Sequence, residues 1–581
     1  MSYRYIAVAS PIGTRISDIA PTIEATLLDA GMVACFNSGS FTLFVSKETP
    51  ILPLPGGGVV VGHLFTQEGS WIRDQLPPAG SSHVPLRKKI LESYWGAYLL
   101  VEKDSLRDGG MVVTRDPSSS GEIRCLYSVK GEISFLTSDI SLAAHLGLYR
   151  RSVDWDFIAS RLAYPGVKMQ RTGLADIREL LPGCSLRLHG TDTSIEQVWS
   201  PWNFVASDRR HRNLHEAAAE VRSAVAKVTH AWASTDTSIL LELSGGLDSS
   251  IVAACLRNAS ARVTCCNLVT PAPGADERAY ANLVAKRLGV ELHAEELSYE
   301  SACFEFEPPP DSASPGMGPL QRAINGTMEA AANRHGATSF ISGGGGDTVF
   351  CYLRTAAPAA DALCERGFLA GNSAVRDLAE LHQCTLWKAG RLALSKLLKA
   401  PKSPYDMDAS FIPSNALIGT PEAHPWFVAP VCALPGDRER IFDLAGNQMF
   451  PDQLPRGTRH RLHMPLLSQP VMEACLKTPS WMWISGGLNR AVARIAFKDL
   501  LPMEVLNRRS KGTFMNYLGA LYQRHRNAIS QFLLTGQLQE RGLLETVSLK
   551  QFLGNDAPPR DQAFLRIFYL AMIENWVRYQ R

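Results

Sequence analysis

The feature that most constrains this chain is the stretch SILLELSGGLDSSIVAACL, residues 238–256. The apolar run 239–241 predicts a buried strand, and the apolar residues from 251 onward predict a helix. Two glycines, an acid and three serines lie between them. Glycines at a strand end let backbone N–H groups approach an anion, hydroxyls add donors, and the helix N-terminus adds a favourable dipole. The stretch therefore predicts a phosphate-binding loop.

We expect the phosphates to contact the glycines and hydroxyls of this loop, which are Ser244, Gly245, Gly246, Ser249 and Ser250. Asp248 would repel a phosphate unless a cation lay between them, so the loop also implies Mg²⁺. It is not a Walker A loop, because no GxxxxGK[ST] pattern is present. A glycine-rich turn with a serine cap would explain SGG alone, but SGGLDS after a strand favours a binding site.

A second glycine loop, FISGGGGDTVF at residues 340–350, repeats the design of a strand, glycines and an acid. Four glycines alone could equally be a flexible linker. Two such loops in one parallel sheet can, however, hold one Mg²⁺-pyrophosphate between them, which suits attack at the α-phosphate. We therefore predict that Asp248 and Asp347 are both metal ligands, and that Ser342 and Gly343 contact the nucleotide.

The chain divides into two predicted domains. Up to about residue 200, short β-rich runs separated by Gly, Ser, Asp and Pro predict an antiparallel α+β domain. The Pro- and charge-rich segment 199–213 marks the boundary, giving domains 1–205 and 206–581. Beyond it, a helix at 214–232 precedes strands that alternate with helices, which predicts a doubly wound parallel sheet with its ligand site at the carboxyl ends of the strands. Four strands are expected there, at 239–241, 262–269, 290–297 and 337–342, and a mainly helical part follows from about residue 360.

Composition excludes several classes of protein. A net charge of +3 is too close to balance for a nucleic-acid binder held mainly by phosphate contacts. The twelve cysteines contain no CxxC pair, which favours reduced thiols over disulfides or zinc. No basic and apolar leader opens the sequence, and no apolar run approaches about 20 residues. We expect a soluble cytoplasmic protein with neither a nucleic-acid nor a membrane partner.

SGGLDSS is the motif of the PP-loop ATP pyrophosphatases, and the wider pattern resembles the asparagine synthetase family over nearly the whole chain. ARIAFKDLLPMEVLNRRSKGTF (493–514) resembles the family segment that contains a catalytic lysine, here Lys511. The resemblance implies ATP as cofactor, with adenine held by backbone groups flanking Leu243 and Leu268. TRDPSSSGEIRCLY and ELLPGCSLRL resemble parts of the family's glutaminase domain, which implies an Ntn-glutaminase-like sandwich in the N-terminal half.

Departures from the family pattern narrow the subclass. The glutaminase nucleophile is a cysteine at position 2, and this chain has Ser2 and lacks the RGPD and NGEIYN motifs, so the N-terminal domain is expected to be inactive. The SGEGSDE loop has become residues 342–348, with both glutamates lost, which argues against free aspartate as substrate. The PFLD stretch appears as MPLLSQPVMEA (464–474). The combination most resembles the lasso-peptide cyclases, which are macrolactam synthetases.

This resemblance implies an AMP-forming ligase. With Mg²⁺ and ATP it would adenylate an Asp or Glu side chain of a precursor core peptide, and the N-terminal amine would close an isopeptide macrolactam. Lys511 would stabilise developing negative charge, and a leader peptidase would be a partner. Two alternatives stay open: a β-lactam synthetase-like or asparagine synthetase-like enzyme acting on a small molecule, and a non-catalytic nucleotide-binding homologue.

Three further features have less specific interpretations. RHRLH (459–463) is interpreted as a surface or substrate-facing basic patch rather than a metal site, since no carboxylate or Cys lies at ligand spacing. Trp481 and Trp483 are expected to pack in the core. Glu242, at the end of the first strand, could belong to the substrate pocket or to a structural pair.

Overall fold

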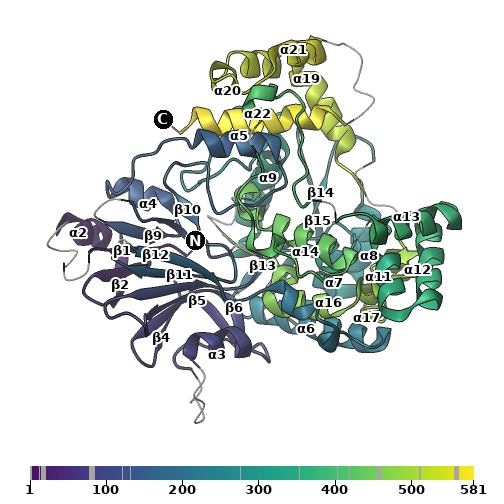
Figure 1. The fold of residues 1–581 in the computed structure, drawn as a ribbon, viewed down its shortest axis with the longest axis horizontal. Helices are drawn as coiled ribbons and strands as arrows, with labels where there is room; N and C mark the ends of the chain where they lie inside the picture. Colours follow the sequence, from purple (N-terminus) through teal and green to yellow (C-terminus); the bar gives the residue numbers. More distant parts are fainter. Residues whose placement is uncertain are drawn as a thin grey trace.

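The protein has a mixed α/β fold, as the sequence predicted (Figure 1). Two antiparallel sheets occupy the N-terminal part, and a parallel sheet with helices follows. The computed structural model describes residues 3–11, 14, 21–76, 85–120, 122–130, 133–190, 192–274, 276–352, 354–401, 403–417, 419–454, 460–509, 512–554 and 562–580. Ser2 and Lys511 lie outside the described residues.

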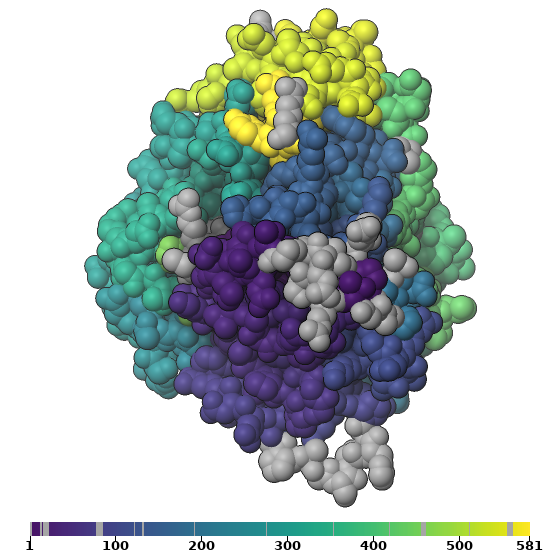
Figure 2. Space-filling model, turned by 90° about the vertical axis from the view of Figure 1, so that its left-hand side faces the viewer, coloured from purple at the N-terminus to yellow at the C-terminus, as the bar shows by residue number. Residues whose placement is uncertain are grey.

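The two N-terminal sheets form a sandwich whose inner faces share one buried cluster, in which Tyr5 and Leu43 of one sheet join Val61 and Leu99 of the other. The first sheet has the order β10 (Arg178–Glu179), β8 (Leu126–Ser128), β9 (Ser134–Thr137), β1 (Tyr5–Ala9), β3 (Phe41–Ser46) and β2 (Met32–Asn37). The second has the order β12 (Asp192–Gln197), β11 (Cys184–His189), β7 (Met111–Arg115), β6 (Tyr94–Lys103), β5 (Gly58–Thr66) and β4 (Ile51–Leu54). These strands make up much of the face seen in Figure 2.

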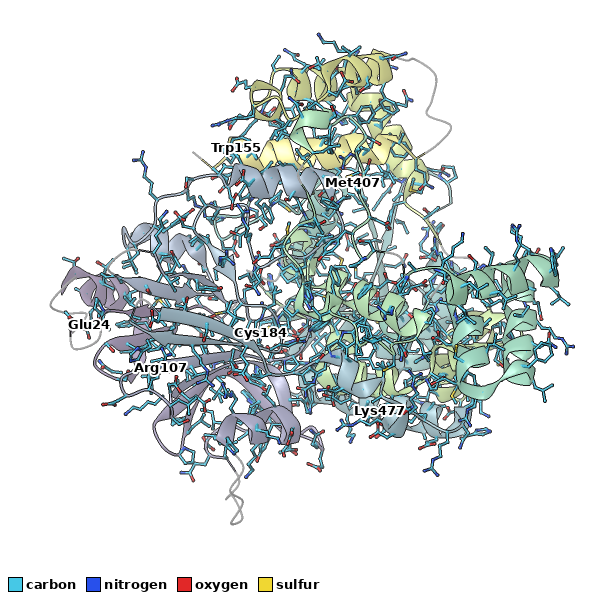
Figure 3. The ribbon with its side chains drawn as sticks, viewed as in Figure 1. Glu24, Arg107, Trp155, Cys184, Met407 and Lys477 are labelled. Carbon is cyan, nitrogen blue, oxygen red and sulfur yellow. The ribbon has the colours of Figure 1, made fainter. Side chains whose placement is uncertain are left out.

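Short helices cover the sandwich, and their bounds are α2 (Pro21–Asp29), α3 (Leu86–Ser93), α4 (Ile140–His145) and α5 (Trp155–Ala163). Side chains fill the interior around the buried Cys184, whereas Glu24 on α2 lies at the outer edge (Figure 3). None of the twelve cysteines is in a disulfide, as expected from their scattered positions.

The parallel sheet has the order β15-β14-β13-β16-β17. Its strands are β13 (Ser238–Glu242), β14 (Arg262–Val269), β15 (Leu292–Glu296), β16 (Ser339–Ser342) and β17 (Arg461–His463). The connecting helices are α7 (Leu247–Cys255), α8 (Arg278–Leu288) and α9 (Pro319–His335). The four predicted strands are confirmed. Gly289 is the C-cap of α8, with a left-handed φ of +71° that favours glycine.

The remaining chain is mainly helical, as predicted. Its longer helices are α11 (Ala357–Arg366), α12 (Phe368–Leu381), α13 (Leu386–Leu398), α14 (Pro435–Asn447), α16 (Gln469–Lys477), α17 (Ala491–Ala496), α19 (Met515–Leu534), α21 (Thr546–Gly554) and α22 (Phe564–Arg578). Trp483 is fully buried and packs against Phe350 at 5.9 Å between ring centroids, which confirms its packing role. Among the described residues, no helix is both long enough and apolar enough to cross a membrane.

The sequence pattern did not predict β17. The interpretation of RHRLH as a basic patch is wrong for His463. This residue is fully buried in β17, opposite Ile341 of β16. Its Nε2 lies 2.9 Å from Asp236 Oδ2 and its Nδ1 lies 3.1 Å from Glu122 Oε2. Burial alone would lower the pKa of His463, but the two carboxylates outweigh it and raise this pKa to about 9.

This histidine joins the two halves of the chain. Glu122 follows β7 in the N-terminal half, whereas Asp236 precedes β13. Trp232, near the end of α6 (Leu214–Ala233), stacks on the His463 ring at 4.7 Å and meets Phe65 of β5 edge-on at 5.0 Å. The charged imidazole and its two carboxylate partners therefore lie at a buried junction that is lined by aromatic rings.

We expect the His463→Gln variant to be less stable than the wild type by about 3 kcal/mol near pH 6, because it leaves Glu122 without its cation, whereas Asp236 keeps Arg461. The folded-state pKa is raised, so the stability that protonated His463 contributes is complete below its unfolded value of about 6.5 and is lost as the pH rises through about 9. Urea unfolding at several pH values should therefore show the difference shrinking between these limits. The matched control is His230→Gln, at an exposed histidine on α6. A difference that is independent of pH would contradict a charged His463.

Candidate active site

The first glycine loop leaves β13 and enters α7 as predicted. Gly246 is the N-cap residue of α7, and Asp248 lies in its first turn. The Ser244 hydroxyl lies 3.0 Å from the Ser249 hydroxyl and accepts a hydrogen bond from Gly246 N at 3.3 Å. The N-terminal turn of a nine-residue helix is thus lined with hydroxyls and backbone N–H groups, which suits an anion.

The second glycine loop follows β16 and presses against the first. A Cβ added to Gly343 would lie 2.7 Å from Ser249 N, and one added to Gly346 would lie 2.4 Å from Asp248 Cβ and Cγ. Real Cβ atoms do not approach other atoms this closely, so glycine is required at both positions. The glycine run is therefore a packed contact between two strand ends and not a flexible linker.

This contact brings the two predicted metal ligands together. Arg490 Nη1 lies 3.0 and 3.1 Å from the two Asp248 oxygens and 2.8 Å from Asp347 Oδ1. One nitrogen thus bridges both carboxylates. Arg490 has a left-handed φ of +53° at the N-cap of α17, and its guanidinium lies 5.1 Å from the Tyr352 ring centre.

Both loops line a pocket of about 480 Å³ at the carboxyl ends of β13 and β16. Of the residues predicted to bind nucleotide or metal, it is lined by Ser244, Gly246, Asp248, Ser249, Ser342, Gly343 and Asp347. Its other lining residues are Glu242, Leu247, Gly344, Gly345, Gly346, Thr348, Asn447, Phe450, Arg490, Arg494, Val505 and Arg508. Glu242, whose role the sequence left open, therefore faces this pocket.

Four predicted nucleotide contacts lie outside the lining. Gly245 turns with a φ of +73° against α8, and Ser250 is fully buried in α7. Leu243 is also buried, its N–H donates to Cys266 O at 2.8 Å, and its carbonyl accepts from Asn267 Nδ2 at 2.8 Å. Leu268 is paired within the sheet, opposite Glu295 of β15.

Three arginines of the pocket were missed by the sequence analysis, although Arg494 and Arg508 lie in the segment that suggested Lys511. Arg490, Arg494 and Arg508 all line the pocket, where they face the three carboxylates of Glu242, Asp248 and Asp347. Burial and the like charge of Arg490 lower the pKa of Arg494 to about 10, which still leaves it charged at neutral pH. The pocket thus offers cationic groups of a kind that bind phosphates.

Arg508 lies in a run of basic residues, but its side chain is only 8% exposed. It pairs with Glu277, donates to Gly245 O at 3.3 Å and lies 4.1 Å from the Tyr280 ring centre. Gly512 N also donates to Glu277 Oε1, at 2.9 Å. Arg508 and Gly512, on either side of the pair 510–511, are therefore both held by Glu277 beside the first glycine loop.

A second pocket, of about 200 Å³, lies beside the first, because Arg494 lines both. Its other walls come from the end of α12 and from the hairpin of β18 (Ile484–Ser485) and β19 (Leu488–Asn489), together with Tyr352 and two basic residues, Arg354 and Arg509. The site therefore extends beyond the volume enclosed by the glycine loops.

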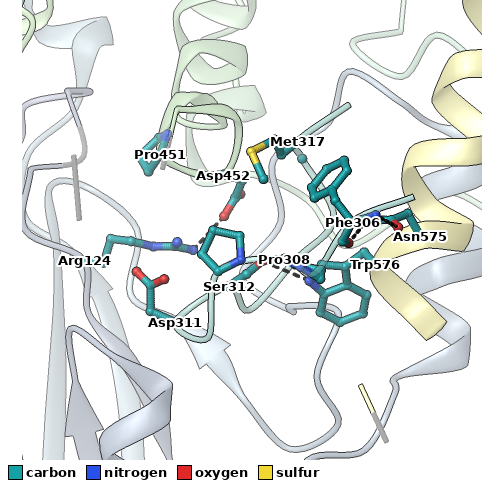
Figure 4. Close-up of a pocket in the computed structure, with 12 residues that line it drawn as sticks. Arg124, Phe306, Pro308, Asp311, Ser312, Met317, Pro451, Asp452, Asn575 and Trp576 are labelled. Carbon is teal, nitrogen blue, oxygen red and sulfur yellow. Dashed lines mark hydrogen bonds and ion pairs between the residues drawn. The ribbon is translucent and has the colours of Figure 1, made fainter. Parts of the chain in front are cut away.

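A third cavity lies at the junction between the N-terminal half and α22 (Figure 4). Its volume is only about 20 Å³, about enough for one water molecule. Arg124 crosses it to Asp452 at 2.8 Å, and burial raises the pKa of the nearby Asp311. Because this cavity is so small and an ion pair crosses it, we interpret it as part of the structural junction and not as a ligand site.

The first pocket fits a magnesium nucleotide. Carboxylate oxygens are the ligands that Mg²⁺ prefers, and Arg490 already places one cationic nitrogen within about 3 Å of both Asp248 and Asp347. No set of three or more His, Cys, Asp or Glu residues that could hold a metal by themselves occurs in the described part of the chain. The fit therefore rests on two carboxylates, with phosphate oxygens available to complete the coordination.

A parallel sheet with two glycine-rich strand ends around one pocket is typical of α/β nucleotide-binding proteins. The family profile described as asparagine synthase matches residues 220–578, more than half of the chain. The chain belongs to the asparagine synthase family. This membership supports an ATP-dependent, amide-forming activity.

No curated protein matches the chain. Among solved structures, it aligns with glutamine phosphoribosylpyrophosphate amidotransferase from B. subtilis at 11% identity and a TM-score of 0.22, over 58% of this chain and 90% of that chain. It also aligns with glutamine-dependent NAD+ synthetase from Acinetobacter baumannii at 14% identity and a TM-score of 0.20, over 61% and 77%. At TM-scores this low, neither match says anything about this chain.

We expect Gly346→Ala to lose nucleotide binding, because the added methyl group would displace Asp248 and separate the loops. The measurement is the rise in melting temperature on addition of Mg²⁺-ATP, which reports binding to the folded state. The matched control is Gly326→Ala on α9, where an added Cβ meets nothing within 4 Å and helix propensity should raise stability by up to about 1 kcal/mol. An unchanged ATP-induced rise in Gly346→Ala would mean that the loop contact is not needed for binding.

Proposed function

We propose that the protein is a lasso-peptide cyclase, an ATP-dependent ligase that forms an isopeptide macrolactam in a precursor core peptide. The observation that carries the proposal is the pair of glycine loops, whose Asp248 and Asp347 are bridged by one nitrogen of Arg490. It is combined with the loss of the two glutamates that the family has in the second loop. The first feature supports adenylation, and the second argues against free aspartate as the acceptor.

In the proposed reaction, a carboxylate oxygen of an Asp or Glu side chain in the peptide attacks the α-phosphorus of ATP. The bond from this phosphorus to the β-phosphate bridging oxygen breaks, and pyrophosphate leaves. The N-terminal amine of the same peptide then attacks the activated acyl carbon, the bond to AMP breaks, and the amine releases a proton. The net change in the peptide is the loss of one water. Holding the two ends of one peptide together supplies the high effective concentration that this second step needs.

Asp248 and Asp347 would hold Mg²⁺, which supplies charge neutralisation for the phosphates when bound. Ser244, Gly246 and Ser249 would donate hydrogen bonds to phosphate oxygens from the loop that opens α7. Arg494 and Arg508, at the wall of the same pocket, add positive charge. Lys511, from outside the described residues, would stabilise the negative charge that develops during acyl transfer.

Two features of the site favour a peptide over a small amino acid. The 200 Å³ pocket that shares Arg494 gives the acceptor room beyond the nucleotide. The glycine loop also presents backbone and no acidic side chain between Ser342 and Asp347, so it offers no carboxylate to bind the amino group of free aspartate. A leader peptidase is the expected partner, because the reaction needs a free N-terminal amine at the start of the core peptide.

We expect Asp248→Asn and Asp347→Asn each to reduce magnesium-dependent pyrophosphate release by about 10²-fold or more, since an amide is a weaker ligand of the same volume. Circular dichroism should be unchanged. Asp208→Asn, at an exposed position, is the matched control. Normal pyrophosphate release by both variants at ordinary Mg²⁺ concentrations would show that the two residues do not share a metal.

Lys511→Ala and Lys511→Arg should both lose ring closure by about 10²–10³-fold while retaining most ATP binding, because a compact ammonium and a planar guanidinium are not interchangeable. Lys498→Ala, an exposed lysine of the same segment, serves as the control. Near-normal closure by Lys511→Ala would assign this lysine to the solvated surface.

The decisive test of the function is mass spectrometry of the core peptide after incubation with the enzyme, Mg²⁺ and ATP. We expect a product that is lighter by one water and resists carboxypeptidase, together with AMP and pyrophosphate in equal amounts. Conversion of free aspartate or of a small β-amino acid, without action on the peptide, would instead support the small-molecule alternative. Absence of ATP–pyrophosphate exchange with every acceptor would support the non-catalytic alternative.

Glutamine should neither be hydrolysed nor stimulate ATP use, because Ser2 lacks a thiolate.

A further inference from the structure

The helical hairpin of α12 and α13 presents large apolar side chains to solvent. It lies at an edge of the molecule away from the N-terminal sheets (Figure 1). The exposed side chains are Phe368 (76%), Leu369 (84%), Trp387 (80%), Leu394 (51%) and Leu398 (83%). Isolated exposed leucines are common on protein surfaces, but several large apolar side chains on one hairpin indicate an interaction surface.

Three of the exposed apolar residues of α13 form a stripe, and Leu386 (54%) and Leu392 (44%) are exposed on either side of it. At about 100° per residue, Trp387, Leu394 and Leu398 fall within about 40° of one another around the helix. Ala389 and Ala393, which are buried, lie on the face turned toward the rest of the protein. The stripe therefore points away from the fold, the reverse of the usual arrangement for a surface helix.

Two more exposed apolar residues lie at one end of the hairpin. A Cβ added to Gly390 of α13 would meet Val375 of α12 at 3.9 Å, which sets the antiparallel register of the two helices. In this register the first turn of α12, with Phe368 and Leu369, lies at the same end of the hairpin as Leu398.

Positive charge lies on one flank of the stripe, with Arg391 nearest to it. Lys388, Arg391 and Lys399 are all exposed, and no described carboxylate pairs with any of them. Lys396, on the inner side of α13, pairs with Glu439. The helix has no acidic residue. The hairpin thus offers Trp and Leu flanked by cations, a composition typical of helices that lie in the interface of an anionic membrane.

The shape of the hairpin favours a flat and deformable partner over a peptide. Residues of α13 line neither of the two pockets around the glycine loops. An extended or helical peptide needs a groove, whereas a projecting helix can sink its apolar side into the headgroup region while the adjacent lysines and arginine meet lipid phosphates.

We propose that the α12–α13 hairpin docks the protein on an anionic lipid bilayer, with the stripe of Trp387, Leu394 and Leu398 in the interface. The attachment is peripheral, consistent with the finding that no described helix could cross a membrane. It departs from the sequence-based expectation of no membrane partner, which considered only spanning segments, and it is independent of the peptide substrate.

The test is flotation of the full-length protein with vesicles of phosphatidylcholine containing about one third phosphatidylglycerol, compared with phosphatidylcholine alone. We expect co-flotation with the anionic vesicles that weakens as salt rises. Leu394→Glu combined with Leu398→Glu should lower the partition coefficient about tenfold or more, and glutamate keeps the helix intact. Lys388→Gln, Arg391→Gln and Lys399→Gln together should remove the preference for anionic lipid.

The matched control is Leu106→Glu, which changes a leucine of similar exposure (76%) in the turn between β6 and β7. It should float like the wild type. The proposal is overturned if the wild type stays in the bottom fraction of the gradient. It is equally overturned if the α13 leucine variant floats as well as the wild type. It is also overturned if sedimentation shows a dimer that this variant abolishes while vesicles bind neither protein, because the stripe would then be covered by a second copy.

Discussion

The candidate site depends on the parallel pairing of β13 with β16 at the centre of the sheet. Because the strands run in the same direction, Glu242 and Ser342 lie side by side at their carboxyl ends, and the two loops that follow must meet. Glycine at 343 and 346 allows this meeting at backbone distance. All the chemistry proposed here, from metal binding to phosphate contacts, uses positions set by that one pairing.

A second set of constraints holds the two halves of the chain together. His463 of β17 reaches Glu122 in the N-terminal half, and Arg124 reaches Asp452 in the C-terminal half, both through buried ion pairs. Buried charges of this kind are costly to separate, since a partner left alone stays unpaired in a region of low dielectric constant. The N-terminal sandwich is therefore joined to the parallel sheet by electrostatic contacts as well as by aromatic packing around Trp232.

Much of the fold was predictable because its signals are local. The strand of β13, the glycine loop and the helix that follows appear in one stretch of 19 residues, and the alternation of strands and helices then fixes a parallel sheet. By contrast, β17 has three residues, two of them basic, and is a strand only because β16 offers it an edge. No periodicity can reveal such a strand.

The same distinction applies to the site. Asp248 and Asp347 were found because each follows a strand and a run of glycines. Arg490 lies 143 residues beyond Asp347, in a segment with no motif around it, and its role arises only from the tertiary fold. Arg508 was missed for a related reason: a run of basic residues is typical of solvated surface, and only the fold places Glu277 and Tyr280 against this side chain.

Arg490 also has a consequence for how the site is assembled. Two carboxylates directed at one point repel each other, and here the chain itself provides the neutralising charge. Arg490 thus neutralises both loops from within the chain, whereas small metalloproteins rely on their metal for this and unfold when it is removed. Under the proposed function, a divalent ion would replace one positive charge between these carboxylates by another, and a chelator would then remove activity while leaving the loops folded.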